Sequence, residues 1–585
     1  MQTQAAEPVA SGRLAQTAFA LLGNWFWSGL LLIILALLVI YPMIMLVVGA
    51  LTDMDPITEG IDVSRFALHH FSAALTNPNA SAALVNSLIA CGGGALVAVV
   101  VGLTFSWMVV RTNMPGRKLI AALSYIPLFV PPMVGAIAWS LLGSPTTGLL
   151  NTFFKWLNVD VRINIYSMGG LIAVFGMYYA PYVYMFTASA LRNMDPTLEE
   201  ASEISGASAF YTQLHVTFPL ILPAILSSML LSFVVMLGIY GIPSVLGSQS
   251  GIMLLSTYLF QLTSWSPPLY NAAAAVSILM IIVAAVLVLI QQKVLSKRSY
   301  ITISGKGFRP RELNLGHWKW LLLVLALIYL LVVVVLPIGA LAIAATRKFM
   351  FVPTMASLFE LKQYSWGHFQ TVLADQQTIQ SVWNTLVIGC ATALVGGVLA
   401  FAIGYTVQRK DAPAARVIDL ISTLPAAVPG LIVGVAYLWA WIGLPIGLYG
   451  TIWILVFAFV GRFIPDTVKV LSTSLAQIHP ELKEAAWISG KGPLRTIMTI
   501  ILPLAKPGVA AAMTLLFVLA IRELGSSLFL YTTDTMMMAI ALLNLYESGT
   551  LGTAAAFGLA QVVLLGLLIG LANRLSGGST NSSVG

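Results

Sequence analysis

Charged side chains are scarce in this sequence: Asp, Glu, Lys and Arg make up 9% of its 585 residues, where soluble domains carry about 25%. A soluble chain of this length cannot cover its core with so few charges. The composition therefore excludes a cytosolic enzyme, a nucleic-acid-binding protein and a disordered scaffold. Apolar residues make up 59% and the mean hydropathy is +0.92. The net charge is +8, but in a membrane protein the positions of Lys and Arg are more informative, because they indicate which loops are cytoplasmic.

Cysteine is almost absent as well. Cys91 and Cys390 both lie in long apolar runs, so we expect small buried hydrophobic residues, with no disulfide and no metal site. No nucleophile–base pair, metal-ligand cluster or cofactor motif is found. Two Ser-Gly-Lys-Gly runs, at Ser304 and Ser489, lack the Ser or Thr that a phosphate-binding loop places after its Lys. The sequence predicts a protein without catalytic residues, metal or cofactor of its own.

Long apolar runs are abundant instead. With about 20 residues per membrane span, the sequence predicts an all-α polytopic membrane protein of about twelve transmembrane helices. The first run begins near Trp27 and is too long for a signal peptide, so it is expected to stay as a membrane helix. The predicted spans centre near residues 39, 96, 131, 179, 233, 282, 331, 394, 430, 460, 517 and 562.

The basic residues give the orientation. With a cytoplasmic N-terminus, 21 of the 29 Lys and Arg fall in cytoplasmic segments, 6 in external loops and 2 inside spans, as the positive-inside rule requires. Both termini are then cytoplasmic. The most basic segment joins the sixth and seventh spans, and we interpret it as a topology anchor at the lipid surface. Its basic residues are Lys293, Lys297, Arg298, Lys306, Arg309 and Arg311.

The sequence contains an internal repeat. Residues 191–223 align with 475–507 at an offset of 284 with twelve identities in 33 positions. A second block aligns at an offset of 298 and pairs His70 with His368. The chain is therefore predicted to be two tandem six-helix units. The expected segments are a cytoplasmic tail (1–26), a first half (27–295), a basic linker (296–317), a second half (318–575) and a polar C-terminal tail (576–585).

The repeated segments are polar loops of about 25 residues between the fourth and fifth spans of each half. Each loop predicts a short helix, over residues 196–205 and 480–489, with a proline and carboxylates in its first turn. Gly206 and Gly490 follow where a helix end calls for positive φ. A short amphipathic cytoplasmic helix, present twice, indicates docking of two copies of a soluble partner.

These loops resemble the signature of the membrane permeases of binding-protein-dependent (type I) ABC importers: Glu-Ala-Ala, three residues, Gly, nine residues, Ile-x-Leu-Pro. The second copy matches throughout, with Glu484, Ala485 and Gly490. The first copy has Glu200, Ala201 and Gly206, with Ser202, Val216 and Phe218 as mild departures. The remaining signature positions of the second copy also match: Ala486, Ile500, Leu502 and Pro503. The resemblance covers residues 65–295 and 363–575.

The resemblance implies a type I permease fold in a bacterial inner membrane, with each loop forming a coupling helix on one of two ATP-binding subunits. It also implies an external substrate-binding protein. The fused chain with Arg522-Glu523-Leu524-Gly525 is most similar to the ferric-iron permeases, while thiamine, phosphonate, sugar phosphate or polyamine remain alternative substrates. A twelve-helix secondary transporter is the alternative class, but its Asp-Arg loop signature is missing at 113–118.

Ionisable residues inside predicted spans mark a candidate pathway or gate. Arg462 and Asp466 are four residues apart in the tenth span, and Arg522 and Glu523 lie in the eleventh. At the repeat offset they correspond to Tyr178, Tyr182, Gly238 and Ile239, so we expect an asymmetric cavity between the halves. Tyr178 and Tyr182 are candidates to line it, with ordinary packing and interface aromatics as the alternative. Two readings stay open: the charges pair to lock helix packing, or they act in substrate passage.

Two apolar stretches, 252–262 and 536–546, precede the last span of each half. At about 11 residues they are too short to span. They are predicted to form short external helices at the outer mouth.

Overall fold

The computed structural model describes residues 25–54, 65–296, 312–409, 412–479 and 481–575. These residues form an all-α structure, and pairing between extended segments is limited within them to isolated bridges such as Thr52 with Phe66. Most of the predicted tails and of the basic linker, including Lys297 to Arg311, lies outside the described residues. The chain is an all-α polytopic membrane protein.

The first half begins with one long helix, Trp25–Leu51, which contains η1 (Ala36–Ile40) and α2 (Tyr41–Leu51). It continues with α3 (His69–Thr76), α4 (Pro78–Arg111), α5 (Arg117–Leu123), α6 (Ile126–Phe129), α7 (Pro132–Gly143), α8 (Leu149–Trp156), α9 (Met168–Asn193), α10 (Thr197–Ile204), α11 (Ala209–Thr212), η2 (Gln213–Thr217), α12 (Phe218–Leu220), α13 (Leu222–Leu237), η3 (Pro243–Gly247), η4 (Ser248–Ser250), α14 (Leu255–Ser264) and α15 (Tyr270–Ser296).

The second half repeats this order. Its elements are α16 (Trp318–Leu330), η5 (Leu331–Val335), α17 (Leu336–Thr346), η6 (Met355–Phe359), η7 (Leu361–Gln363), α18 (Gly367–Ala374), α19 (Gln376–Val407), α20 (Ala415–Thr423), η8 (Leu424–Ala427), α21 (Gly430–Trp441), α22 (Ile452–Ala476), α23 (Glu481–Ile488), α24 (Pro493–Thr496), η9 (Ile497–Ile501), α25 (Leu502–Ile521), α26 (Ser527–Leu530), η10 (Thr533–Thr535), α27 (Met538–Glu547) and α28 (Leu551–Leu575).

Eleven of the twelve predicted span centres fall on these helices, and the other, residue 131, lies at the break between α6 and α7. Within the described ranges, eight helices are long and apolar enough to cross a membrane, and three further spans are pairs of helices bent at a short break. The remaining predicted span, the tenth, coincides with α22, which is 25 residues long, carries Arg462, Asp466 and Lys469, and is not among these eleven candidates. The short helices predicted before the last span of each half are present as α14 and α27.

The third span of each half is broken at its prolines, where a continuous helix that tolerates proline is expected from the sequence. The two parts meet at 99° around Pro131-Pro132 and at 114° around Pro429. Proline has no N–H to donate, and it forces the preceding residue into extended backbone. Val130 (ψ 128°) and Val428 (ψ 117°) adopt that conformation, so both helices end there and new ones begin.

Glycines let α4 and α9 pack closely. A Cβ on Gly102 would lie 2.5 Å from the carbonyl oxygen of Ala180 and 2.9 Å from the backbone nitrogen of Tyr184. Close backbone approach of this kind is how membrane helices gain packing energy in the absence of a hydrophobic drive between them.

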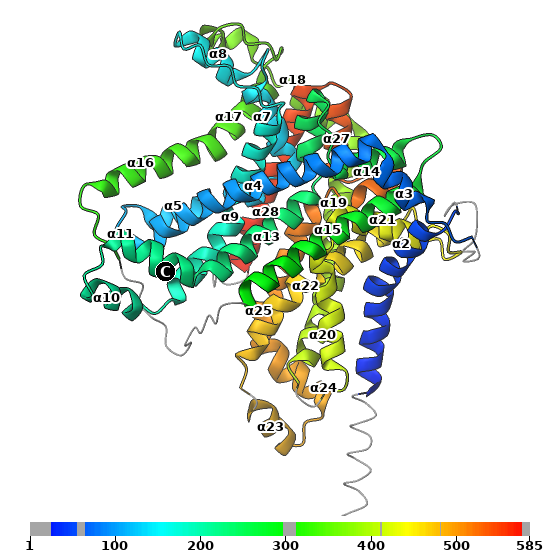
Figure 1. Ribbon diagram of the computed structural model, residues 1–585. Coiled ribbons are helices and arrows are strands. Elements are labelled where there is room, and N and C mark those ends of the chain that lie inside the picture. Colours follow the sequence, from blue (N-terminus) through cyan, green and yellow to red (C-terminus); the bar gives the residue numbers. More distant parts are fainter. Residues whose placement is uncertain (1–24, 55–64, 297–311, 410–411, 480, 576–585) are drawn as a thin grey trace, which may run out of the picture.

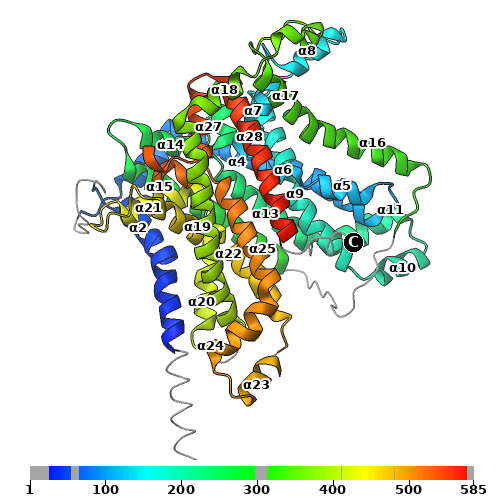
Figure 2. The ribbon, with the colours of Figure 1, turned by 180° about the vertical axis from the view of Figure 1, so that it is seen from behind.

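The first helix of each half packs against the other half. Residues of α2 contact α21, and the hydroxyl of Tyr41 donates to Ala440 O at 2.9 Å, while Tyr437 donates back to Leu38 O at 2.6 Å. Correspondingly, α16 lies against α5 and α17 against α7 (Figure 2). The two halves therefore exchange their first helices across a pseudo-twofold arrangement.

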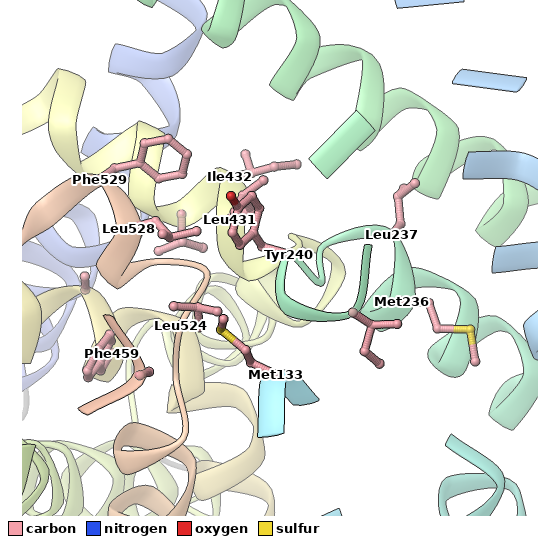
Figure 3. Packing of buried hydrophobic residues seen from close by; sticks show 14 of the residues in the cluster. Met133, Met236, Leu237, Tyr240, Leu431, Ile432, Phe459, Leu524, Leu528 and Phe529 are labelled. Carbon is pink, nitrogen blue, oxygen red and sulfur yellow. The ribbon is translucent and has the colours of Figure 1, made fainter. Parts of the chain in front are cut away.

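The buried core runs across the boundary between the halves. Met133 and Tyr240 of the first half lie beside Leu524, Leu528 and Leu431 of the second (Figure 3). The two halves thus form one continuous core and not two separate ones.

The prediction that both cysteines are buried is wrong for one of them. Cys91 is buried, but Cys390 is exposed. Cys390 lies on the face of α19 that other helices leave uncovered, and a helix in a membrane can leave a weakly polar thiol on its outer face.

Candidate functional site

A cavity of about 210 Å³ lies between the two halves. The first half contributes residues of α7, α9 and α13, and the second half contributes η8, α22, the segment after α25, α27 and α28. The four charged residues predicted from the sequence, Arg462, Asp466, Arg522 and Glu523, all line it. Three of their repeat equivalents, Tyr182, Gly238 and Ile239, line the same cavity from the first half. The predicted asymmetric cavity is therefore present.

The break in the third span supplies a polar group to this cavity. In a continuous helix, Leu128 O would accept a hydrogen bond from the backbone N–H of Pro132, which proline lacks. Arg522 Nη1 donates to Leu128 O instead. The guanidinium of the second half is therefore held by a carbonyl that the Pro131-Pro132 sequence leaves without a helical partner.

Arg462 and Glu523 form an ion pair between α22 and the segment after α25. Ser526 N donates to Glu523 Oε1 at 2.9 Å, and Ser526 Oγ donates to Gly430 O at 2.7 Å. A Cβ on Gly430 would overlap the Arg462 guanidinium, so glycine is needed where α21 begins. These contacts lock three elements together and favour a packing role for this pair.

Asp466 differs from the other three charges. Its residue is exposed, it lines the cavity, and it forms no ion pair with any residue that the structure describes. Arg462, one turn earlier on α22, is already paired with Glu523. Asp466 is consequently the carboxylate of this group that is available to a solute.

The predicted pathway tyrosines separate into two groups. Tyr182 lines the central cavity, as does its neighbour Tyr179. Tyr178 instead faces a smaller cavity of about 30 Å³ beside Met177 and Pro337. Tyr178 and Tyr182 both lie near enough to Arg522 to interact with it electrostatically, but Tyr182 is the one that lines the cavity with the charged residues.

Gln561 is a cavity residue that the sequence reasoning missed. It lies on α28, is fully buried, lines the cavity, and neither of its side-chain polar atoms has a hydrogen-bond partner among the described residues. Buried amides are normally satisfied, so this side chain is open to a ligand or water. A lone glutamine in an apolar span was the available signal.

The two repeat loops form the predicted short helices, α10 and α23, which project from their halves beyond the spans (Figure 1). Gly206 (φ 89°) and Gly490 (φ 75°) follow them in the left-handed region, which only glycine adopts freely. Glu200, Ala201, Glu484 and Ala485 are all exposed.

Both loops also expose an isoleucine. Ile204 and Ile488 occupy the same repeat position, and each is 88% exposed. An apolar residue this open, at the same place in both copies and beside exposed alanines, is typical of a surface that a partner covers.

A buried ion pair fixes α10 but not α23. Arg111 Nη1 lies 3.3 Å from Glu199 Oε2, with side chains 0% and 4% exposed, and Thr217 donates to Glu199 Oε1 at 2.6 Å. In the second half the equivalent of Glu199 is Lys483, whose Nζ lies 5.0 Å from the Tyr405 ring. The sequence reasoning missed this pair because its two members are far apart in the chain.

The sequence matches the family model described as a binding-protein-dependent transport system inner membrane component over residues 80–300 and 395–577, once in each half. A ferric transport system permease protein of Actinobacillus pleuropneumoniae is 26% identical over 578 residues, 95% of this chain and 80% of the relative. A putative ferric transport system permease protein of Haemophilus influenzae is 26% identical over 522 residues, 88% and 79% of the two chains. An Fe(3+)-transport system permease protein of the same organism is 23% identical over 553 residues, 94% and 98%.

Proposed function

Because the chain belongs to the family of inner-membrane components of binding-protein-dependent transport systems, we propose that it forms the complete pore of an ATP-driven importer of ferric iron. It is a non-catalytic, multi-pass inner-membrane permease subunit of an ABC importer that works with a substrate-binding protein. We further propose that two ATP-binding subunits dock on α10 and α23, that both termini are cytoplasmic, and that the cargo is iron.

The coupling role rests on the paired loops. Both carry an exposed isoleucine, exposed alanines and a positive-φ glycine at matching positions. A helix that leaves its apolar residues open to water twice, at equivalent places, suits docking of two identical soluble subunits. Glu200 and Glu484 lie one turn before the exposed isoleucines and would border that contact.

Iron as the cargo is supported by the relatives that match nearly the whole chain and by the donors in the cavity. Fe³⁺ is a hard ion that prefers oxygen ligands. Among the described residues, Asp466 offers a carboxylate outside any ion pair, and Tyr182 and Gln561 supply further oxygen atoms around the same space. A cavity of about 210 Å³ has room for a small solute and a few waters, since each water occupies about 30 Å³.

The coupling loops provide the test. Gly206→Val and Gly490→Val force a β-branched residue into the left-handed region, which costs about 1–3 kcal/mol at each site, so the loops should leave their docking conformation. We expect the double variant to reach the membrane at wild-type levels and to lose binding-protein-dependent uptake of radioactive iron and the coupled ATP hydrolysis. Both are measured in vesicles holding the full complex.

Gly492→Val is the matched control, because Gly492 is exposed in the same loop, has φ −67° and has open space around its Cα. Its uptake should stay near wild type. Undiminished uptake by the double variant would rule out the coupling role. If coupled ATP hydrolysis responds to another loaded binding protein and not to the iron-loaded one, iron is not the cargo, but the coupling role still holds.

A further inference from the structure

Three possible metal ligands lie close together beside the C-terminal end of α2. Asp53, His69 and His70 each offer one ligand atom, and these atoms all lie within 4.8 Å of one another. Asp53 Oδ1 is 3.3 Å from His70 Nε2 and 3.9 Å from His69 Nε2. None of the three lines the central cavity.

The backbone holds these residues in place. Thr52 pairs with Phe66, Asp53 N donates to Arg65 O at 3.1 Å, and Ala67 N donates to Leu51 O at 2.7 Å. This pairing brings the end of α2 beside the start of α3, which also packs against α15 and α4 (Figure 1). The histidines open α3, with ring centroids 4.1 Å apart.

The second half shows what the same backbone does without a ligand set. There Arg347 pairs with Tyr364 and Lys348 N donates to Gln363 O at 2.8 Å, so Lys348 stands where the first half has Asp53. Gly367 and His368 stand where it has His69 and His70. His368 Nε2 is 3.0 Å from Arg347 O and is a structural histidine.

His70 is held in a similar way, because it interacts with the backbone of Thr52, the equivalent of Arg347, and also with the Asp53 carboxylate. Its Nε2 lies 3.3 Å from Asp53 Oδ1. Ligand atoms about 2.0–2.2 Å from a tetrahedral ion lie about 3.4 Å from each other, which is close to this spacing. The first half therefore places a second histidine and a carboxylate beside the ring of His70, with one ligand atom of each within 4.8 Å of the others.

We propose that Asp53, His69 and His70 bind a divalent first-row transition metal ion of the Zn²⁺ class. Two imidazoles and one carboxylate are three protein ligands suited to such an ion, and they leave a coordination position for water. The side chains of Asp53 and His69 are 62% and 60% exposed, so the ion can enter from solvent.

The bound ion would link the end of α2 to α3. This position is at the opposite end of α4 from Arg111 and the α10 loop, and in the proposed orientation it faces the outside. Ferric cargo prefers all-oxygen ligands, so the site is separate from the transport pathway and binds its ion independently of the proposed function.

The test uses the full chain in lipid nanodiscs, titrated with Zn²⁺ by calorimetry and with Co²⁺ by visible absorption. We expect one ion per chain, the absorption bands of tetrahedral Co²⁺, and a higher melting temperature with Zn²⁺. Asp53→Lys and His69→Gly copy residues that the second half carries on the same backbone, so the variants should fold. Each should weaken Zn²⁺ binding by at least about tenfold.

His479→Ala is the matched control, since His479 is also exposed and lies 3.5 Å from the carboxylate of Glu481 without a third ligand. It should leave the stoichiometry and affinity unchanged. Zn²⁺ binding that survives in the double variant D53K/H69G, or that is lost in H479A, overturns the proposal. Iron uptake in chelator-treated vesicles should be the same for D53K and the wild type, so a failure of iron transport leaves this test intact.

Discussion

Among single residues, Arg111 depends most on one partner. Its side chain is fully buried at the end of α4, and Glu199 is the carboxylate that lies against it. Removing one member of a buried ion pair leaves an uncompensated charge, which is far more costly than the pair was favourable.

We therefore expect Glu199→Ala to lower the free energy of unfolding by about 3–5 kcal/mol, as measured by titration with a denaturing detergent. Lys483→Ala, the equivalent change in the second half, removes a side chain that lies over a half-buried tyrosine ring, and should cost less than about 1 kcal/mol. Equal losses from the two variants would contradict a structural role for the pair.

The cavity charges should separate by function. Asp466→Asn removes the cavity carboxylate that has no ion-pair partner in the described part of the chain, so iron uptake should fall by about tenfold or more, equivalent to ~1.4 kcal/mol, while the complex stays assembled. Glu523→Gln breaks the contact with Arg462 and should lower the melting temperature as well as uptake. Uptake assays beside size-exclusion chromatography of the complex measure both effects; a stable Glu523→Gln complex with normal melting would contradict the packing role.

At the scale of elements, the α4–α9 contact depends on glycine at one face of α4. Gly102→Ala places a methyl group within 2.5–2.9 Å of α9 backbone atoms, and neither backbone can move cheaply. We expect a loss of about 1–3 kcal/mol in the free energy of unfolding and a lower melting temperature by scanning fluorimetry.

Gly92 offers the control on the same helix, because nothing lies within 4 Å of an added Cβ. Gly92→Ala should be neutral or stabilising by up to about 1 kcal/mol, since alanine favours a helix over glycine. If the Gly102→Ala and Gly92→Ala proteins have the same melting temperature, α4 and α9 do not pack this closely.

Elements whose signals are local could be predicted from the sequence. The helices α10 and α23 are marked by a proline, carboxylates and a terminal glycine within ten residues, and the structure has them. The breaks of 99° and 114° in the third spans were not predicted, because proline in a membrane helix is compatible with a bend of any size until its neighbours are known. The bend of 62° after Leu220 is absent from the second half, although Pro219 and Pro503 are equivalent, so proline alone does not explain it.

At the scale of the whole molecule, the repeat gave the two halves and the count of spans, but not how they meet. The exchange of first helices rests on contacts such as Tyr437 with Leu38, whose partners are about 400 residues apart. The partners Arg522 and Leu128 are equally far apart, and Arg111 and Glu199 of the buried ion pair lie on separate helices of the first half. Such pairs follow from the packing of complete helices, and no local pattern in a single sequence reports them.

The one-sided charge of the cavity has a consequence for how such a pore can change. In a pore built from two identical chains, every residue at the axis occurs twice, so Arg462 and Glu523 would each face a copy of themselves. Joining the halves in one chain removes that constraint: one half keeps Tyr182 and Gly238 while the other carries all four charges. In the fused chain, a substitution in one half changes one wall of the cavity and leaves the other wall as it was. The coupling loop of the other half is also unaffected by it.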